Sequence, residues 1–164
     1  MPATYEPIAS VNGTGSSDTI SFTSIPGTYT DLVVIARGRI SSGSDAILQF
    51  NTDIGNNYST TILYGTGTTA GSYRETSQAR ILADFYGYPA DNNNHIGIYH
   101  IMNYANTATN KTVLCRSNNA GTGIDATVGL WRSTVAINSV QIKNTGNRNW
   151  YTDSTFALYG IKAA

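Results

Sequence analysis

The sequence predicts an all-β fold: a single antiparallel β-sandwich, jelly-roll-like, with about eight to ten strands. The first observation is composition, because Gly (16), Asn (16), Ser (15) and Thr (22) make up 69 of the 164 residues, whereas Glu occurs twice. This mixture is rich in turn formers and β-branched Thr and poor in helix formers. The second is a series of strand-length apolar segments, spaced about 12 residues apart and bounded by turn clusters. No helical period separates them, so antiparallel pairing is expected.

The first third of the chain contains three such segments. Residues 19–23 follow a turn-rich stretch and place Ile20 and Phe22 on one face. Residues 31–40 form a largely apolar run, which is typical of a buried strand. After a turn rich in Ser and Gly, residues 46–51 supply the third expected strand.

The middle of the chain continues the pattern. Residues 58–64 and 78–86 are expected to be strands, and the Gly- and Thr-rich residues 65–72 are expected to be a flexible connection. Residues 95–104 alternate clearly. One face of that segment carries Ile96, Ile98, His100 and Met102, and the other carries Gly97, Tyr99, Ile101 and Asn103.

The last third contributes four expected strands. They cover residues 111–116, 128–132, 137–143 and 155–161. Polar residues 117–123 are expected to form the turn between the first two.

The chain reads as one domain with an N-terminal extension. No change of composition divides residues 16–164, which are expected to form the sandwich. Residues 1–15 are expected to form an extended arm, because Pro2 and Pro7 disfavour helix. Tyr5, Pro7 and Ile8 are the candidate contacts of this arm with a neighbouring subunit, and a frayed terminus is the alternative.

Charge and hydropathy exclude several classes of partner. The ten basic and ten acidic residues cancel, and the basic residues are not clustered, so no nucleic-acid binding is expected. No apolar stretch is long enough to span a membrane, and the first 20 residues lack the apolar core of a secretory signal. The sequence therefore predicts a soluble protein that contacts neither nucleic acid nor membrane.

No metal or cofactor site is predicted. The segments Asp91–His95 and Asp53–Asn57 are rich in oxygen ligands but lack the spacing of a calcium loop, and Asx-rich segments commonly form turns. His95 and His100 lie five residues apart on one strand, so they should point to opposite faces and cannot chelate one ion. The single cysteine, Cys115, cannot form an internal disulfide and is expected to be a packing residue.

No catalytic set is predicted. The serines show no nucleophile elbow, and no pair of acids stands out for glycoside hydrolysis. The aromatic residues offer another role, because exposed rings stack on sugars or anchor protein interfaces. Candidate interface or ligand-stacking residues are Trp150, Tyr151, Tyr86 and Tyr88, with core packing as the alternative for each.

Two segments have a distinctive sequence. One is Tyr5-Glu6-Pro7-Ile8-Ala9 together with residues 20–33 (ISFTSIPGTYTDLV), and the other is residues 154–161 (STFALYGI). Both resemble segments of small virion proteins of tailed bacteriophages. The resemblance covers the N-terminal quarter and the last expected strand. It implies a non-enzymatic jelly-roll protein of the virion, assembled in the host cytoplasm.

Within that group the resemblance leaves two roles open. The first is a capsid decoration (cement) protein that stabilises the head, binds the major capsid protein or another virion protein, and forms a homo-oligomer, with a trimer favoured. The absence of a coiled-coil or β-helix stalk pattern favours this role. The second is a tail appendage or fibre-tip module that binds a receptor or carbohydrate.

Overall fold

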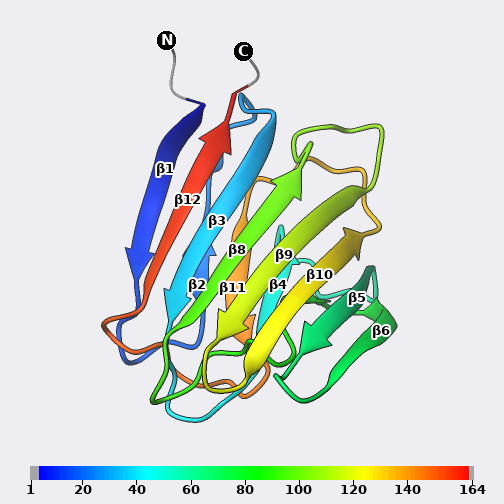
Figure 1. Cartoon of the computed structure of the whole chain (residues 1–164). Coiled ribbons are helices and arrows are strands. Elements are labelled where there is room, and N and C mark those ends of the chain that lie inside the picture. The colour runs from blue at the N-terminus through cyan, green and yellow to red at the C-terminus, as the bar shows by residue number, and fades with distance from the viewer. Residues whose placement is uncertain (1–3, 163–164) are drawn as a thin grey trace.

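The computed structural model describes residues 4–162 and confirms the predicted all-β antiparallel sandwich. Two sheets of unequal size pack face to face (Figure 1). In the order of their hydrogen bonding, the strands of the large sheet are β1 (Tyr5–Asn12), β12 (Thr155–Ile161), β3 (Asp31–Gly38), β8 (His95–Met102), β9 (Lys111–Asn119), β10 (Gly123–Trp131), β5 (Tyr58–Gly65) and β6 (Ala70–Gln78). The small sheet contains β2 (Ile20–Phe22), β11 (Val140–Asn144), β4 (Ala46–Phe50) and β7 (Ile81–Leu82).

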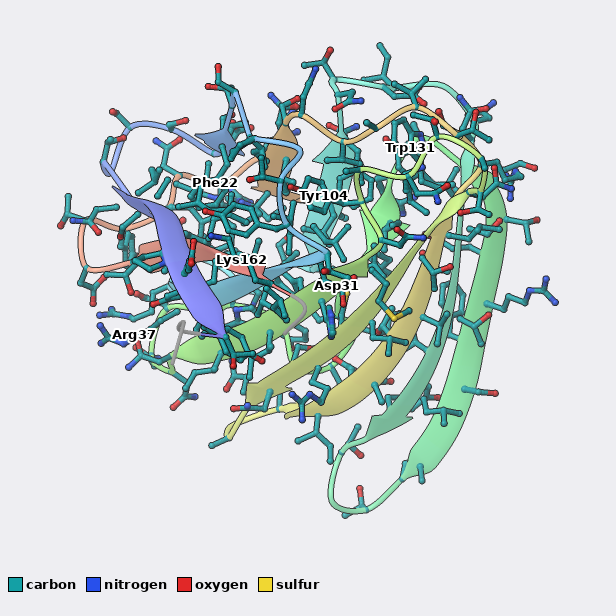
Figure 2. All side chains as sticks on the ribbon, turned by 90° about the horizontal axis from the view of Figure 1, so that it is seen from above. Phe22, Asp31, Arg37, Tyr104, Trp131 and Lys162 are labelled. Carbon is teal, nitrogen blue, oxygen red and sulfur yellow. The ribbon has the colours of Figure 1, made fainter. Side chains whose placement is uncertain are left out.

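The core lies between the two sheets. Period-two alternation sends every second side chain of β3, β8, β9 and β10 toward the small sheet, where those side chains are buried. Figure 2 shows Phe22, Tyr104 and Trp131 within this layer. Within residues 4–162 no helix is long and apolar enough to cross a membrane.

The large sheet extends past the edge of the small one and curves (Figure 2). Ile62 of β5 packs with Ile47 and Leu82 of the small sheet in a second, smaller apolar cluster. Tyr64 and Phe85 pack against the same cluster. The β5–β6 hairpin therefore curls around this side of the sandwich.

Twelve strands are present in the described residues, two more than the ten expected segments. Strand β6 occupies part of the segment expected to be a loop, residues 65–72. Its sequence is polar and mostly exposed because it is an edge strand that pairs with β5 alone, so it has no apolar period to recognise. The strand expected over residues 78–86 shortens to Ile81–Leu82, and the chain from 83 to 94 is irregular.

Strands β9 and β10 are longer than expected. They form one hairpin that pairs from Gly123↔Asn119 to Trp131↔Lys111, so part of the turn expected over residues 117–123 is strand. Ser117, Asn119 and Asp125 are polar yet buried in this part of the hairpin. Polar residues with buried partners do not produce the apolar alternation on which the expectation rested.

The expected N-terminal arm is, over its described part, a strand of the same sandwich. Tyr5–Asn12 pairs with β12 as the edge strand of the large sheet, with a bulge between Pro7 and Ala9. Proline is tolerated at a sheet edge, where its missing N–H breaks no inner ladder. Residues 1–3 of the expected arm lie outside the described residues.

Candidate functional surface

The face of the large sheet that points away from the small sheet carries the main candidate site. We call it the outer face, and it is formed by the outward side chains of β3, β8, β9, β10 and β5. The strand register aligns these side chains in rows across the sheet. The first row is Ile35, Ile98, Arg116, Ala126 and Leu63; the second is Val33, His100, Leu114, Val128 and Thr61; the third is Arg37, Ile96, Asn118, Ile124 and Gly65.

The outer face exposes an unusual amount of aliphatic surface. Leu63 and Ile124 expose 62% and 63% of their surface, and Val128 exposes 50%. Two more exposed side chains continue these rows. Ile96 of β8 lies in the third row with Ile124, and Leu114 of β9 lies beside Val128 in the second row. Single exposed apolar side chains are ordinary, but contiguous aliphatic rows on one sheet face mark an interaction site.

Two adjoining grooves hollow this face. Their volumes are about 590 and 510 Å³. Leu63, Ile98, Arg116 and Ala126 line both of them, so the first row forms their common boundary. The larger groove continues toward Ile96 and Ile124, and the smaller one toward Leu114 and Val128.

The charges of the outer face are mostly positive. Arg116 stands in the first row between Ile98 and Ala126, and within residues 4–162 its guanidinium has no hydrogen bond or ion pair. The carboxylate of Asp31 lies 2.8 Å from Nε2 of His100 and is thereby paired. An exposed arginine among aliphatic side chains is therefore left without a counter-ion.

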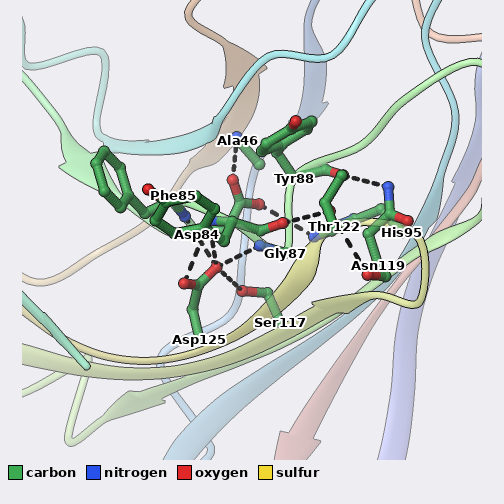
Figure 3. A network of polar contacts seen from close by, with 11 residues as sticks. Ala46, Asp84, Phe85, Gly87, Tyr88, His95, Ser117, Asn119, Thr122 and Asp125 are labelled. Carbon is green, nitrogen blue, oxygen red and sulfur yellow. Dashed lines mark hydrogen bonds and ion pairs between the residues drawn. The ribbon is translucent and has the colours of Figure 1, made fainter. Parts of the chain in front are cut away.

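Beneath the outer face, on the inner side of the sheet, lies a buried polar network (Figure 3). The carboxylate of Asp125 accepts hydrogen bonds from the backbone N–H groups of Phe85, Tyr86 and Gly87 and from the hydroxyl of Ser117. The shortest of these is 2.6 Å, from Gly87. This one side chain fastens the irregular segment after β7 to the β9–β10 hairpin.

Asp84 and His95 form the second part of the network. Nε2 of His95 lies 3.1 Å from Oδ2 of Asp84, and both side chains are buried. Oδ1 of Asp84 accepts the backbone N–H of Ala46. Burial raises the pKa of Asp84, although the hydrogen bond and charge of His95 oppose the rise. An Asp–His pair this deep is beyond the reach of a substrate, and it joins the small sheet to β8.

Trp150 was a candidate stacking residue, and the structure corrects this expectation. Its ring is fully buried and packs edge-on against Phe156, with the centroids 5.0 Å apart. Its Nε1–H donates to the carbonyl of Asp18. The ring of Trp150 is thus packed inside the protein and its N–H is hydrogen-bonded there, as is usual for a core Trp.

The neighbouring Tyr151 is half-buried and partly available. Its hydroxyl lies 2.9 Å from Oδ1 of Asp91, and the guanidinium of Arg39 lies 5.1 Å from its ring centroid. A polar hollow of about 320 Å³ adjoins it. Gly15, Ser41, Asn147, Arg148, Asn149 and Tyr151 line this hollow.

Tyr86 and Tyr88 are half-buried and engaged within the chain. The ring of Tyr86 lies 4.6 Å from that of Tyr64 and 5.0 Å from that of Phe85. The carbonyl of Tyr88 accepts a hydrogen bond from Asn119. The structure does not bring these two tyrosines together with Tyr151 in one site, because the cavity beside Tyr151 includes neither of them.

The candidate arm residues lie on β1. Tyr5 is exposed and contacts Tyr159 edge-on at 6.4 Å, and Pro7 is exposed at the sheet edge. Ile8 is partly buried and packs against the core. Tyr5 and Pro7 remain at the surface, whereas Ile8 serves the fold of its own chain.

The segments weighed for metal binding form other interactions. The carboxylate of Asp53 accepts hydrogen bonds from Gly55, Asn57 and the indole of Trp131, which is the turn structure expected for an Asx-rich segment. Burial opposes ionisation here, but these hydrogen bonds lower the pKa of Asp53. His95 points inward and His100 outward, as the alternation predicted. Residues 4–162 contain no group of three or more His, Cys, Asp or Glu side chains arranged to hold a metal ion.

The outer face is the feature that the sequence interpretation missed. Its signal was the presence of large apolar residues on both faces of one strand, Ile96 and Ile98 on one side and Tyr99 and Ile101 on the other. An antiparallel strand with one solvated face is polar on that face, so this pattern indicates a second surface that needs a cover.

No protein-family model matches the sequence, and no curated protein matches it. Among solved structures, the chain is similar to a mutant of the alginate lyase Aly36B in complex with alginate tetrasaccharide, with a TM-score of 0.34 and 7% sequence identity. The match covers 94% of this chain and 88% of that chain. A likeness of this degree says nothing about what the present chain does.

Proposed function

We propose that the chain is a non-enzymatic structural protein of a tailed-phage virion, a capsid decoration protein that binds a protein neighbour through its outer face. The observation that carries this proposal is the set of uncovered aliphatic rows, in which Leu63, Ile124 and Val128 are half-exposed or more. The virion setting rests on the resemblance of residues 5–9, 20–33 and 154–161 to small virion proteins.

The chemistry of the outer face favours a protein partner. Its three rows contain Leu, Ile and Val side chains and no Tyr, Phe or Trp. The nearest ring in their register is that of Tyr159, which continues the second row on β12 and packs edge-on against Tyr5. The side chains of the rows that can hydrogen-bond are Arg37, Arg116, His100, Asn118 and Thr61, and each stands beside aliphatic side chains in its row. Aliphatic surface of this kind is buried productively against the aliphatic surface of another protein.

A decoration protein needs only modest affinity at each contact. Many copies bind a lattice of repeated sites, so small interfaces sum over the particle. A homo-oligomer, with a trimer at positions of local three-fold symmetry, belongs to the same proposal. Four ionisable side chains that could serve chemistry elsewhere, Asp84, Asp125, His95 and Cys115, are buried here. Asp125 and the Asp84–His95 pair hold segments of the chain together, which agrees with a structural role.

The test adds the purified chain to emptied capsids of the phage and measures bound copies per particle. Leu114→Asp places a charge in the second row and is expected to reduce binding by roughly thirtyfold or more. Ile54→Asp is the matched control, because Ile54 is 73% exposed on a loop. Binding at lattice stoichiometry that Leu114→Asp abolishes and Ile54→Asp preserves supports the proposal. Binding restricted to tails, or equal loss in both variants, refutes it.

The polar hollow beside Tyr151 favours a second candidate, the receptor- or carbohydrate-binding module of a tail appendage. Amide side chains, an arginine and a half-exposed tyrosine ring are groups that recognise sugars. Glycan-array binding that Tyr151→Ala removes and Leu114→Asp preserves would support this role. Trp150→Ala is unsuitable here, because Trp150 is a core residue.

A further inference from the structure

We infer that the partner surface on the outer face is a protein surface in which carboxylates stand among aliphatic side chains, with Arg116 as the central contact. This inference rests on the proposed function and specifies the chemistry of the partner. It begins with the position of Arg116, which lines both grooves and is flanked in its row by Ile98 and Ala126. Any partner that covers the aliphatic rows must also cover this guanidinium.

Covering an unpaired arginine is unfavourable unless the partner supplies an acceptor. Within residues 4–162 the side chains of Arg39, Arg80 and Arg132 all have hydrogen-bond or ion-pair partners. Arg116 and Arg74 have none among the same residues. A charge that is desolvated without a partner costs much of the interface's free energy, whereas a carboxylate opposite the guanidinium can accept two parallel hydrogen bonds.

The outer face of a second copy of this chain cannot supply the carboxylate that Arg116 needs. Face-to-face stacking of two copies would bring arginines of both copies into one interface, since Arg37 and Arg116 belong to the rows and Arg74 of β6 pairs with Thr61 at the end of the second row. The acid at the border of the face, Asp31, is already paired with His100. Like charges in an interface oppose association.

Neither the exposed side of the small sheet nor the loop around Ile54 offers Arg116 a free carboxylate. The small sheet turns Ser21, Gln49, Gln141 and Lys143 away from the core, and these supply no carboxylate. The exposed loop residue Ile54 has an acidic neighbour, Asp53, but that carboxylate is occupied by three donors. Complementarity therefore points to a different protein and not to a further copy of this chain.

The shape of the grooves favours a protein over a small amphiphile. They lie open along the face of the sheet, and adjacent strands continue the aliphatic rows beyond them. A single alkyl carboxylate in an open groove would leave much of its surface in water, whereas ligand pockets bury most of their ligand. A ridge of Leu, Ile or Val with Asp or Glu beside it covers both the rows and the cation.

The test uses a random peptide library displayed on yeast and selected against the folded wild-type protein, Arg116→Glu and Lys143→Glu. Lys143→Glu makes the same change of charge on the small sheet and is the control. We expect wild type and Lys143→Glu to enrich peptides in which Asp or Glu adjoins Leu, Ile or Val. Arg116→Glu should bind these peptides roughly thirtyfold more weakly, and selection against it should enrich peptides with Lys or Arg instead.

Peptides without acidic residues, enrichment unchanged by Arg116→Glu, or no enrichment would each overturn the inference. So would self-association in sedimentation velocity that Arg116→Glu alters, or saturable binding of dodecanoate by calorimetry that Leu114→Asp abolishes. The capsid experiment separates this inference from the proposed function. Capsid binding that is lost in Leu114→Asp but unchanged in Arg116→Glu retains the function and refutes the role of Arg116.

Discussion

Asp45, which immediately precedes β4, shows how burial sets the pH dependence of a single side chain. Burial raises the pKa of Asp45 to about 7, and the nearby carboxylates of Asp84 and Asp125 add to the rise. The folded state therefore binds a proton on Asp45 at pH values where the unfolded chain, with an ordinary pKa near 3.8, does not. By linkage, this group favours folding below about pH 4, and its contribution is lost as the pH rises toward 7.

Asp45→Asn removes this titration, and so we expect it to stabilise the protein at pH 8 but not at pH 4. The gain is about 1–2 kcal/mol, less than the whole shift implies, because the side chain is partly exposed and water screens it. Urea unfolding of wild type and variant across this pH range measures the difference. A difference that is the same at both pH values would contradict the expectation.

Trp150 provides a second residue-scale prediction. Trp150→Ala removes a fully buried ring, its contact with Phe156 and its hydrogen bond to Asp18. We expect a loss of about 3–5 kcal/mol in the free energy of unfolding. Tyr151→Ala, at the half-buried neighbour, should cost roughly 1 kcal/mol. Equal losses in chemical denaturation would show that Trp150 is not the core residue described above.

At the scale of elements, β7 and β10 approach each other closely at one glycine. A Cβ added to Gly129 of β10 would lie 2.6 to 3.0 Å from three side-chain carbons of Ile81 in β7. These distances are too short for unchanged packing, so the close approach of the two sheets requires glycine at this position.

A double-mutant cycle tests this contact. Gly129→Ala is expected to cost about 1–3 kcal/mol by overpacking, and Ile81→Ala about 2–5 kcal/mol by leaving a cavity. The double variant should lose clearly less than the sum, since the new methyl enters the vacated space. Strict additivity in thermal or urea unfolding would mean that the two strands are not coupled at this point.

The elements also differ in how well sequence pattern predicts them. Strands β3 and β8 were predicted because long apolar or alternating runs place large side chains in the core. Strand β6 was not, because an edge strand is held by backbone hydrogen bonds to β5 and needs no apolar period. The short β7 depends on its pairing with β4, which no local pattern encodes.

For the molecule as a whole, Cys115 reports on opening of the sandwich. Cys115 is 2% exposed, and burial raises the pKa of its thiol well above the usual range, with the charge of Asp84 adding to the effect. Thiolate is the reactive form, so the native protein should resist a thiol reagent until the two sheets separate. When refolding is faster than the thiol reaction, the rate of labelling by 5,5′-dithiobis(2-nitrobenzoate) should therefore be proportional to the population of the unfolded state. When the thiol reaction is faster, the labelling rate should equal the rate of global unfolding.

Denaturation provides the control, because the unfolded chain should react rapidly and with one equivalent of reagent. Stabilising and destabilising variants such as Asp45→Asn and Gly129→Ala should shift the native labelling rate in opposite directions at pH 8. Rapid labelling of the native protein would instead indicate a local opening around β9.

The sequence by itself determined the class of fold and some local features, such as the orientation of two histidines and one Asx-rich turn. Period-two apolar segments between turn clusters lead to antiparallel sheets whatever their order, because alternation and turn chemistry are local properties. The opposite orientation of His95 and His100 followed from the same period. The turn role of Asp53 likewise followed from residues close to it in the chain.

Only the tertiary structure decided which apolar side chains are covered. Trp150 lies in a polar stretch but is buried by Phe156 and Asp18, residues that the chain brings to it from elsewhere. Leu63 and Ile124 belong to apolar stretches but remain exposed, because the small sheet covers one side of the large sheet and leaves the other open. Burial is a property of how sheets stack, and the stacking partner of a strand face is not written in its local sequence.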